Sequence, residues 1–172
     1  INIHRIINDK IATKDNISVR IYFFIDVNIN ASINIHLDIP NGVNINIGDY
    51  VKFSEVYDGE KGDLDMIYYV LRDNILLAKS QFKDAIKMMQ AFEHWFGPYP
   101  FYEDSFKIVE VPYLGMEHQS SITYGNKYMK GYLGRDLSRT GWGLKFDYII
   151  IHEAGHEWFA NNITYKDIAD MW

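Results

Sequence analysis

The stretch HEAGHEWFA, residues 152–160, holds two histidines four positions apart, with a glutamate directly after the first. On a helix, positions i and i+4 lie on one face about one turn apart, so His152 and His156 can direct their imidazoles at a single ion. Neutral imidazole suits Zn²⁺. Glu153 lies close enough to reach a water molecule on that ion without being a ligand itself. The spacing therefore predicts a zinc site with Glu153 as general base.

The alternative is a helix that carries two solvated histidines and no metal. The flanking stretches FDYIII and WFA are apolar, which predicts that most of this helix is buried. Burying two histidines and a glutamate without a metal would cost free energy, because their polar groups would lose water. The zinc interpretation is therefore favoured.

A catalytic zinc usually takes three protein ligands and one water, and this motif supplies two. The nearby candidates for the third are Glu157, Asp167 and Asp170. Glu157 follows His156 directly and points about 100° away from it around the helix. Asp167 and Asp170 can contribute only if the chain turns back, and the spacing favours neither.

The rest of the chain predicts an α+β fold. Residues 1 to about 70 have strand patterns, rich in β-branched and aromatic residues or alternating apolar with polar ones. These are ISVRIYFFIDVNI (17–29), INIHLDI (33–39), VNINI (43–47), YVKFSEVY (50–57) and DMIYYVL (65–71). The loop DGEKGD between the last two predicts a hairpin turn.

The character of the sequence changes near Asp73. Apolar residues recur every three or four positions from Ile75 to Phe96, which predicts a helix that ends at Gly97–Pro98. A short strand, SFKIVEV (105–111), follows, and the helix with the histidines is predicted to begin near Leu144. This change places the best candidate for a domain junction near residue 70.

The bulk composition excludes several functional classes. The chain has 172 residues, 48% of them hydrophobic, and a net charge of −6, which argues against nucleic-acid binding because phosphates require clustered cations. It has no cysteine, hence no disulfide or thiolate metal site, and its apolar runs are too short to span a membrane. It begins with INIHRI, a strand-like pattern with no signal peptide, so we expect a piece of something larger. The compartment is left open.

The zinc motif resembles that of the aminopeptidase N family of zinc metallopeptidases, which belong to the gluzincins. The family signature, HExxH-x18-E, matches its first part at His152, Glu153 and His156. The run that follows is similar to the family's path towards the third ligand, which by this resemblance would fall three residues past Trp172. We therefore expect the third ligand outside this chain and expect the chain alone to be inactive.

A second stretch, LGMEHQ (114–119), resembles the exopeptidase motif G-x-M-E-N of the same family. It lies some thirty residues before the zinc motif, as in the family. Glu117 matches the glutamate that binds the free α-amino group of the substrate, and Gly115 and Met116 match neighbouring substrate-binding positions. Two positions differ, since Leu114 stands where the family has Gly and His118 where it has Asn. By the same resemblance SSITYG (120–125) is the edge strand that pairs with the substrate backbone.

The resemblance implies a domain organisation and a function. Residues 1–70 would be the end of an N-terminal β-domain, and residues 71–172 the first half of a thermolysin-like catalytic domain. The implied activity is that of a zinc aminopeptidase, with one Zn²⁺, which removes N-terminal residues from peptides with a free N-terminus by metal-activated water. The alternatives are a thermolysin-type endopeptidase, which would not need Glu117, and a non-catalytic interaction module.

The remaining candidates carry less signal. The family's transition-state tyrosine has no match here, because Tyr113, Tyr124 and Tyr128 stand elsewhere in the pattern. His94 is predicted to be a surface residue near a helix end. No partner pattern accompanies His4 or His36, and nothing in the sequence decides whether Arg135 and Arg139 face substrate. By the resemblance, Asp170 could orient a zinc-bound histidine.

Overall fold

The computed structural model describes residues 37–39, 43–45, 48–167 and 169. The chain divides into two compact units, residues 1–50 and residues 51–172. In the first unit, β1 (Leu37–Ile39) pairs antiparallel with β2 (Val43–Ile45), as the alternating patterns predict. The strand predicted over residues 17–29 and the histidines at positions 4 and 36 lie outside the described residues.

The second unit is built on a five-stranded mixed sheet with the strand order β3-β4-β5-β7-β6. β4 and β7 run parallel to the central β5, and β6 runs antiparallel to β7. The strands are β3 (Tyr50–Gly59), β4 (Gly62–Leu71), β5 (Phe106–Glu110), β6 (Gly115–Met116) and β7 (Ile122–Tyr124). β3 and β4 are joined by the two residues Glu60 and Lys61, so the predicted hairpin turn is confirmed.

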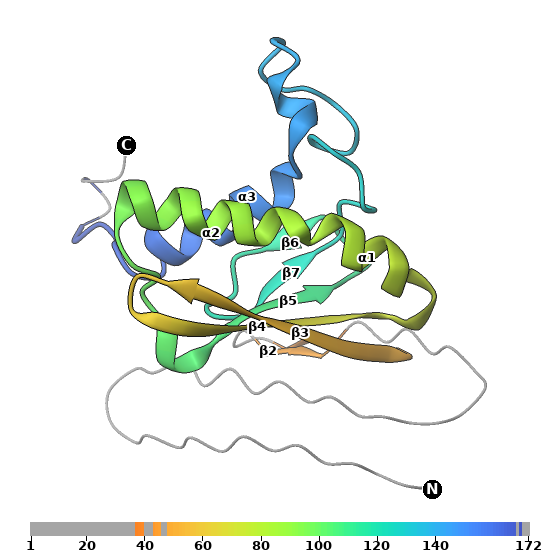
Figure 1. Ribbon diagram of the computed structural model, residues 1–172, viewed down its shortest axis with the longest axis horizontal. Coiled ribbons are helices and arrows are strands. Elements are labelled where there is room, and N and C mark those ends of the chain that lie inside the picture. Colours follow the sequence, from red (N-terminus) through yellow and green to blue (C-terminus); the bar gives the residue numbers. More distant parts are fainter. Residues whose placement is uncertain (1–36, 40–42, 46–47, 168, 170–172) are drawn as a thin grey trace, which may run out of the picture. The chain divides into compact units, whose positions relative to one another are not determined.

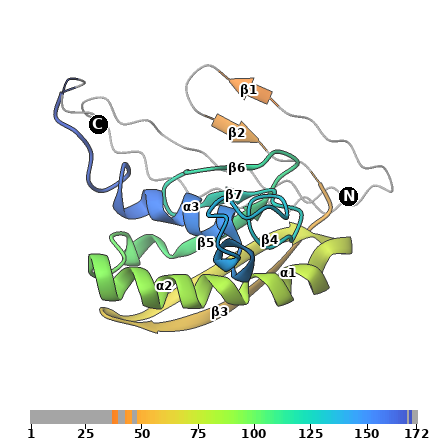
Figure 2. The ribbon, with the colours of Figure 1, turned by 90° about the horizontal axis from the view of Figure 1, so that it is seen from above.

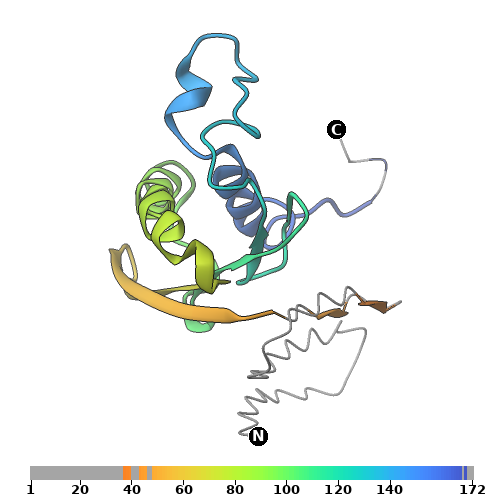
Figure 3. The same cartoon turned by 90° about the vertical axis from the view of Figure 1, so that its right-hand side faces the viewer.

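Alternation along β4 explains how the sheet forms its core. Leu64, Met66 and Tyr68 are fully buried, and the residues between them point to the other face. All three α-helices of the described residues lie on one face of the sheet, as Figures 1 and 3 show. Seen from above, α2 and α3 lie side by side (Figure 2). The α+β fold class is therefore confirmed for this unit.

The periodic stretch from Ile75 to Phe96 forms two helices, α1 (Ile75–Gln81) and α2 (Lys83–Phe96), rather than the single predicted one. They are separated at Phe82, where the backbone forms a turn with φ of −73° and ψ of −2°. Phe82 is buried among other rings, including an edge-to-face contact with Tyr124 at 5.1 Å between ring centroids. The division therefore has a tertiary cause, the packing of Phe82 into the core. Gly97, with φ of 86°, ends α2 as predicted.

The histidine-bearing helix α3 extends from Tyr148 to Trp158, so the predicted start near Leu144 is wrong by one turn. The residues Trp142–Lys145 form a 3₁₀ turn instead, like Arg72–Asn74 and Tyr102–Asp104 earlier in the chain. Asp147 is the N-cap, because its carboxylate accepts hydrogen bonds from the backbone N–H groups of Ile149 and Ile150.

Asp147 also fixes α3 against the rest of the unit. Its fully buried carboxylate accepts hydrogen bonds from the Gln81 amide (2.6 Å), the Tyr124 hydroxyl (2.6 Å) and the Asn126 amide (2.8 Å). These donors come from α1, β7 and the loop after β7. One buried acceptor therefore sets where α3 begins, and with it the turn on which each histidine lies.

The compact unit begins about twenty residues before the predicted domain junction. β4 pairs with β5 over Met66–Tyr69, which joins the hairpin of β3 and β4 to the helical part of the chain. The junction proposed near residue 70 thus falls inside this unit. The assignment of residues 1–70 and 71–172 to two named domains stays a prediction. No helix among the described residues combines the length and apolar character needed to cross a membrane.

Candidate metal centre

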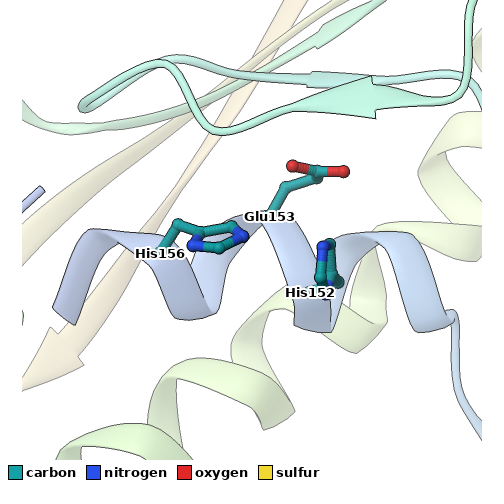
Figure 4. Close-up of side chains that lie close together, drawn as sticks. All are labelled: His152, Glu153 and His156. Atoms are coloured by element: carbon teal, nitrogen blue, oxygen red, sulfur yellow. The ribbon is translucent and has the colours of Figure 1, made fainter. Parts of the chain in front are cut away.

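His152, Glu153 and His156 meet on one side of α3. Their candidate ligand atoms all lie within 4.8 Å of one another, and the two imidazole centroids are 4.9 Å apart. Figure 4 shows the Glu153 carboxylate pointing away from α3 towards a neighbouring strand, with both imidazoles nearby. Two imidazole nitrogens beside a carboxylate form a donor set that suits Zn²⁺. In the part of the chain that the structure describes, no other such group occurs.

The tautomer of His156 is fixed by a backbone contact. Its Nδ1 lies 3.2 Å from the carbonyl oxygen of Phe159, and a carbonyl can only accept, so Nδ1 carries the proton. Nε2 then keeps its lone pair for a metal. Metal-binding histidines usually donate their second nitrogen in this way, which orients the ring and strengthens the ligand. The geometry of His156 therefore fits a metal ligand.

His152 is oriented by an aromatic neighbour one turn earlier on α3. The Tyr148 ring stacks on the imidazole, with centroids 5.5 Å apart and planes 16° from parallel. His152 is exposed and His156 half-buried, so the expectation from the sequence that both histidines are buried is wrong. Loss of hydration around the ring, followed by the nearby His156, still lowers the pKa of His152 and so favours the neutral form that binds metals. Sequence reasoning missed Tyr148. Its position four residues before His152, on the same helix face, was the available signal.

Glu153 is 6% exposed and is covered by β6. A Cβ atom at Gly115 would overlap with the Glu153 carboxylate, so glycine lets the strand approach without displacing that side chain. Burial, followed by the charge of Glu117, raises the pKa of Glu153 to about 7. Glu117 therefore lies close enough to Glu153 to act on its charge, which brings the second sequence motif to the first.

The raised pKa makes stability depend on pH when no metal is bound. After treatment with a chelator, we expect Glu153→Gln to stabilise the fold at pH 8.5 and to change little at pH 4.5. The stability that protonated Glu153 contributes is present below pH 4.5 and is lost as the pH rises through about 7. A pKa change from 4.5 to about 7 corresponds to roughly 3 kcal/mol at high pH. Urea unfolding at both pH values measures the difference, and an equal effect at both would contradict it.

The strand β6 carries Gly115 and Met116 and is the last strand of the sheet. It pairs antiparallel with β7, with Gly115 opposite Tyr124 and Met116 opposite Thr123. The edge strand is therefore β6 and not SSITYG, as the sequence analysis had it, because β7 is paired on both sides. Glu117, directly after β6, is partly buried.

The candidates for a third ligand from this chain lie elsewhere. Glu157 is fully buried, and its carboxylate accepts a hydrogen bond from the backbone N–H of Ser120 at 2.7 Å. Asp167 is exposed and accepts a hydrogen bond from the backbone of Ala169. Asp170 is outside the described residues.

The other sequence candidates are placed as follows. His94 is exposed near the end of α2, as predicted. Arg135 and Arg139 are exposed in the loop before α3, and their role stays untested. The Tyr124 hydroxyl is buried and donates a hydrogen bond to the Asp147 carboxylate.

Comparison with known proteins relates part of the chain to a family. No family model matches the chain. A curated relative, the "Probable aminopeptidase 2" of Sulfurisphaera tokodaii, is 27% identical over 123 residues, which make up 70% of this chain. Over this stretch the chain is a partial match to the M1 zinc metallopeptidase family. It spans 15% of the length of that relative.

Solved M1 structures are also similar to part of the chain. The M1 zinc metallopeptidase from Deinococcus radiodurans is 15% identical, with a TM-score of 0.45, and 65% of this chain covers 22% of it. A variant of a Deinococcus radiodurans M1 enzyme bound to a Tyr-Ser-Ala substrate is 14% identical, with a TM-score of 0.46 and the same coverage. The partial match of this chain to M1 zinc metallopeptidases confirms the predicted family resemblance, and the roles of the two motifs stay predictions.

Proposed function

We propose that the protein is a zinc-dependent aminopeptidase that removes N-terminal residues from peptides. The observation that carries this proposal is the approach of β6 to α3, since Gly115 contacts Glu153 and the charge of Glu117 acts on the same carboxylate. A general base and an anchor for a substrate amine thereby share one site. The assignment of residues 71–172 to a thermolysin-like catalytic domain is part of this proposal.

In the proposed reaction each residue has a separate task. His152 and His156 would hold zinc through one nitrogen each, with a third protein ligand from outside the described residues. The metal, when bound there, would supply a Lewis acid that lowers the pKa of water to about 7. Glu153 accepts a proton from the attacking water and returns it to the leaving amine.

Glu117 gives the site its preference for chain ends. Its charge acts on the Glu153 carboxylate, and it can pair with the ammonium group of a substrate whose first peptide bond faces the base. An endopeptidase would have no use for a carboxylate here, since an internal peptide segment offers no ammonium group. Among the described residues β6 pairs with β7 alone, so the substrate backbone can align along its other side.

The test compares two substrates on the full-length, zinc-loaded protein. Alanine p-nitroanilide has a free amine, and N-acetylalanine p-nitroanilide differs only in having it blocked. We expect hydrolysis of the first alone, abolished by a chelator and restored by Zn²⁺. Comparable hydrolysis of both would indicate the endopeptidase, and hydrolysis of neither in the zinc-loaded protein would favour the non-catalytic module.

A further inference from the structure

The segment Glu117–Ser121 carries the proposed amine anchor, and two residues of the C-terminal region hold it. The Asn161 amide donates a hydrogen bond to the backbone oxygen of Glu117 at 2.9 Å. Glu157 accepts a hydrogen bond from the backbone N–H of Ser120 at 2.7 Å. The two contacts lie near opposite ends of a short turn that connects β6 to β7.

This turn needs support from outside itself. Ser120 has a φ of 58°, in the left-handed region that serine rarely adopts. Within the turn, the backbone N–H of Ser121 donates to the carbonyl oxygen of His118 at 3.0 Å. The hydrogen bond from Ser120 to Glu157 holds the strained residue in place, and Ser120 is only 6% exposed.

The burial of the Glu157 carboxylate costs free energy, which other interactions must offset. Glu157 is fully buried on α3, next to the proposed ligand His156. A buried carboxylate is tolerated when it accepts hydrogen bonds, and Glu157 accepts one from the turn that follows Glu117. One carboxylate oxygen is thus directed at this turn, and the carboxylate also interacts with the buried Tyr99.

Asn161 is hydrogen-bonded to the backbone of α3. Its backbone N–H donates to the carbonyl oxygen of His156 at 3.0 Å, while its side chain holds Glu117. One residue therefore bonds to the backbone of both a proposed zinc ligand and the proposed amine anchor. This connection is short and contains no flexible linker.

We infer that Asn161 and Glu157 are positioning residues that set the place of the Glu117 carboxylate relative to His152, Glu153 and His156. The inference rests on the proposed function. An aminopeptidase must hold the substrate ammonium group one residue away from the bond it cleaves, so the separation of anchor and base decides productive binding. Small displacements of such groups lower rates strongly.

A double-mutant cycle with Glu117→Ala tests this, using kcat/KM for alanine p-nitroanilide with the full-length, zinc-loaded protein. We expect Asn161→Ala to lower kcat/KM by about tenfold, mainly through KM, with the zinc content unchanged. In the Glu117→Ala background the same substitution should change little, because Asn161 acts through Glu117. Asn162→Ala, at the exposed neighbouring position, is the matched control and should have no effect.

A second test compares a conservative and a non-conservative substitution of Glu157. Glu157→Gln keeps an acceptor oxygen for Ser120 and should stay close to wild type, whereas Glu157→Ala should behave like Asn161→Ala. The inference is overturned if Asn161→Ala has no effect or the same effect in both backgrounds. If Glu117→Ala alone leaves free-amine hydrolysis intact, the proposed amine anchor itself fails. The two failures are therefore distinguishable.

Discussion

Glu153→Gln in the full-length, zinc-loaded protein should lower kcat by about 10²–10⁴-fold and leave the zinc content unchanged. This is the usual contribution of a positioned general base. Glutamine has the shape of glutamate but cannot accept a proton from the attacking water. Elemental analysis of the purified variant, alongside kcat for alanine p-nitroanilide, gives both quantities.

The structure makes glutamine a clean substitution at this position. Glu153 is 6% exposed and lies against Gly115, so a side chain of equal size preserves the packing of β6 on α3. The His156 imidazole keeps its contact with the carbonyl of Phe159, because this contact does not involve Glu153. Neither change in packing nor loss of ligand orientation should therefore contribute to the effect.

His156→Gln is the contrasting variant, because it removes a proposed ligand and should lower zinc content and activity together. The ligand atoms of Glu153 and of both histidines lie within 4.8 Å of one another, so Glu153 could in principle be a ligand itself. If Glu153→Gln lost zinc as completely as His156→Gln, Glu153 would be a ligand and the assigned base would be wrong.

What the sequence predicts well is local. The i, i+4 spacing of His152 and His156 brings their rings together on any helix, and the structure places their centroids 4.9 Å apart. Alternation in DMIYYVL gives β4, and the apolar repeat from Ile75 to Phe96 gives the span of α1 and α2. Each of these patterns depends on neighbours within a few positions.

What the sequence does not predict depends on distant contacts. The break between α1 and α2 occurs at Phe82, whose ring packs against Tyr124 of β7. The start of α3 is fixed by the Asp147 carboxylate, which accepts a hydrogen bond from Gln81, 66 positions away. The hydrogen bond of Glu157 to Ser120 could not be predicted, because the two residues are 37 positions apart in the chain. The edge strand β6 has only two residues, too short for a periodic pattern.

Glu117→Ala is expected to weaken catalysis on free-amine substrates far more than any residual hydrolysis of N-acetylated ones. Removing one partner of a partly desolvated charge pair costs about 2–5 kcal/mol, and about 1.4 kcal/mol corresponds to tenfold. The loss in kcat/KM for alanine p-nitroanilide should therefore be at least roughly 30-fold. Glu117 is partly buried, which keeps its carboxylate from being fully screened by water.

The contacts of Glu117 explain why this variant reports on the carboxylate alone. Asn161 holds the backbone oxygen of Glu117, and β6 is paired with β7 through Gly115 and Met116, so neither contact involves the side chain that alanine removes. The segment should keep its place while the charge disappears. Steady-state kinetics on the free and the acetylated substrate separate the outcomes. Equal losses on both would mean that Glu117 serves the fold or the base, and that the ammonium group is bound by another residue.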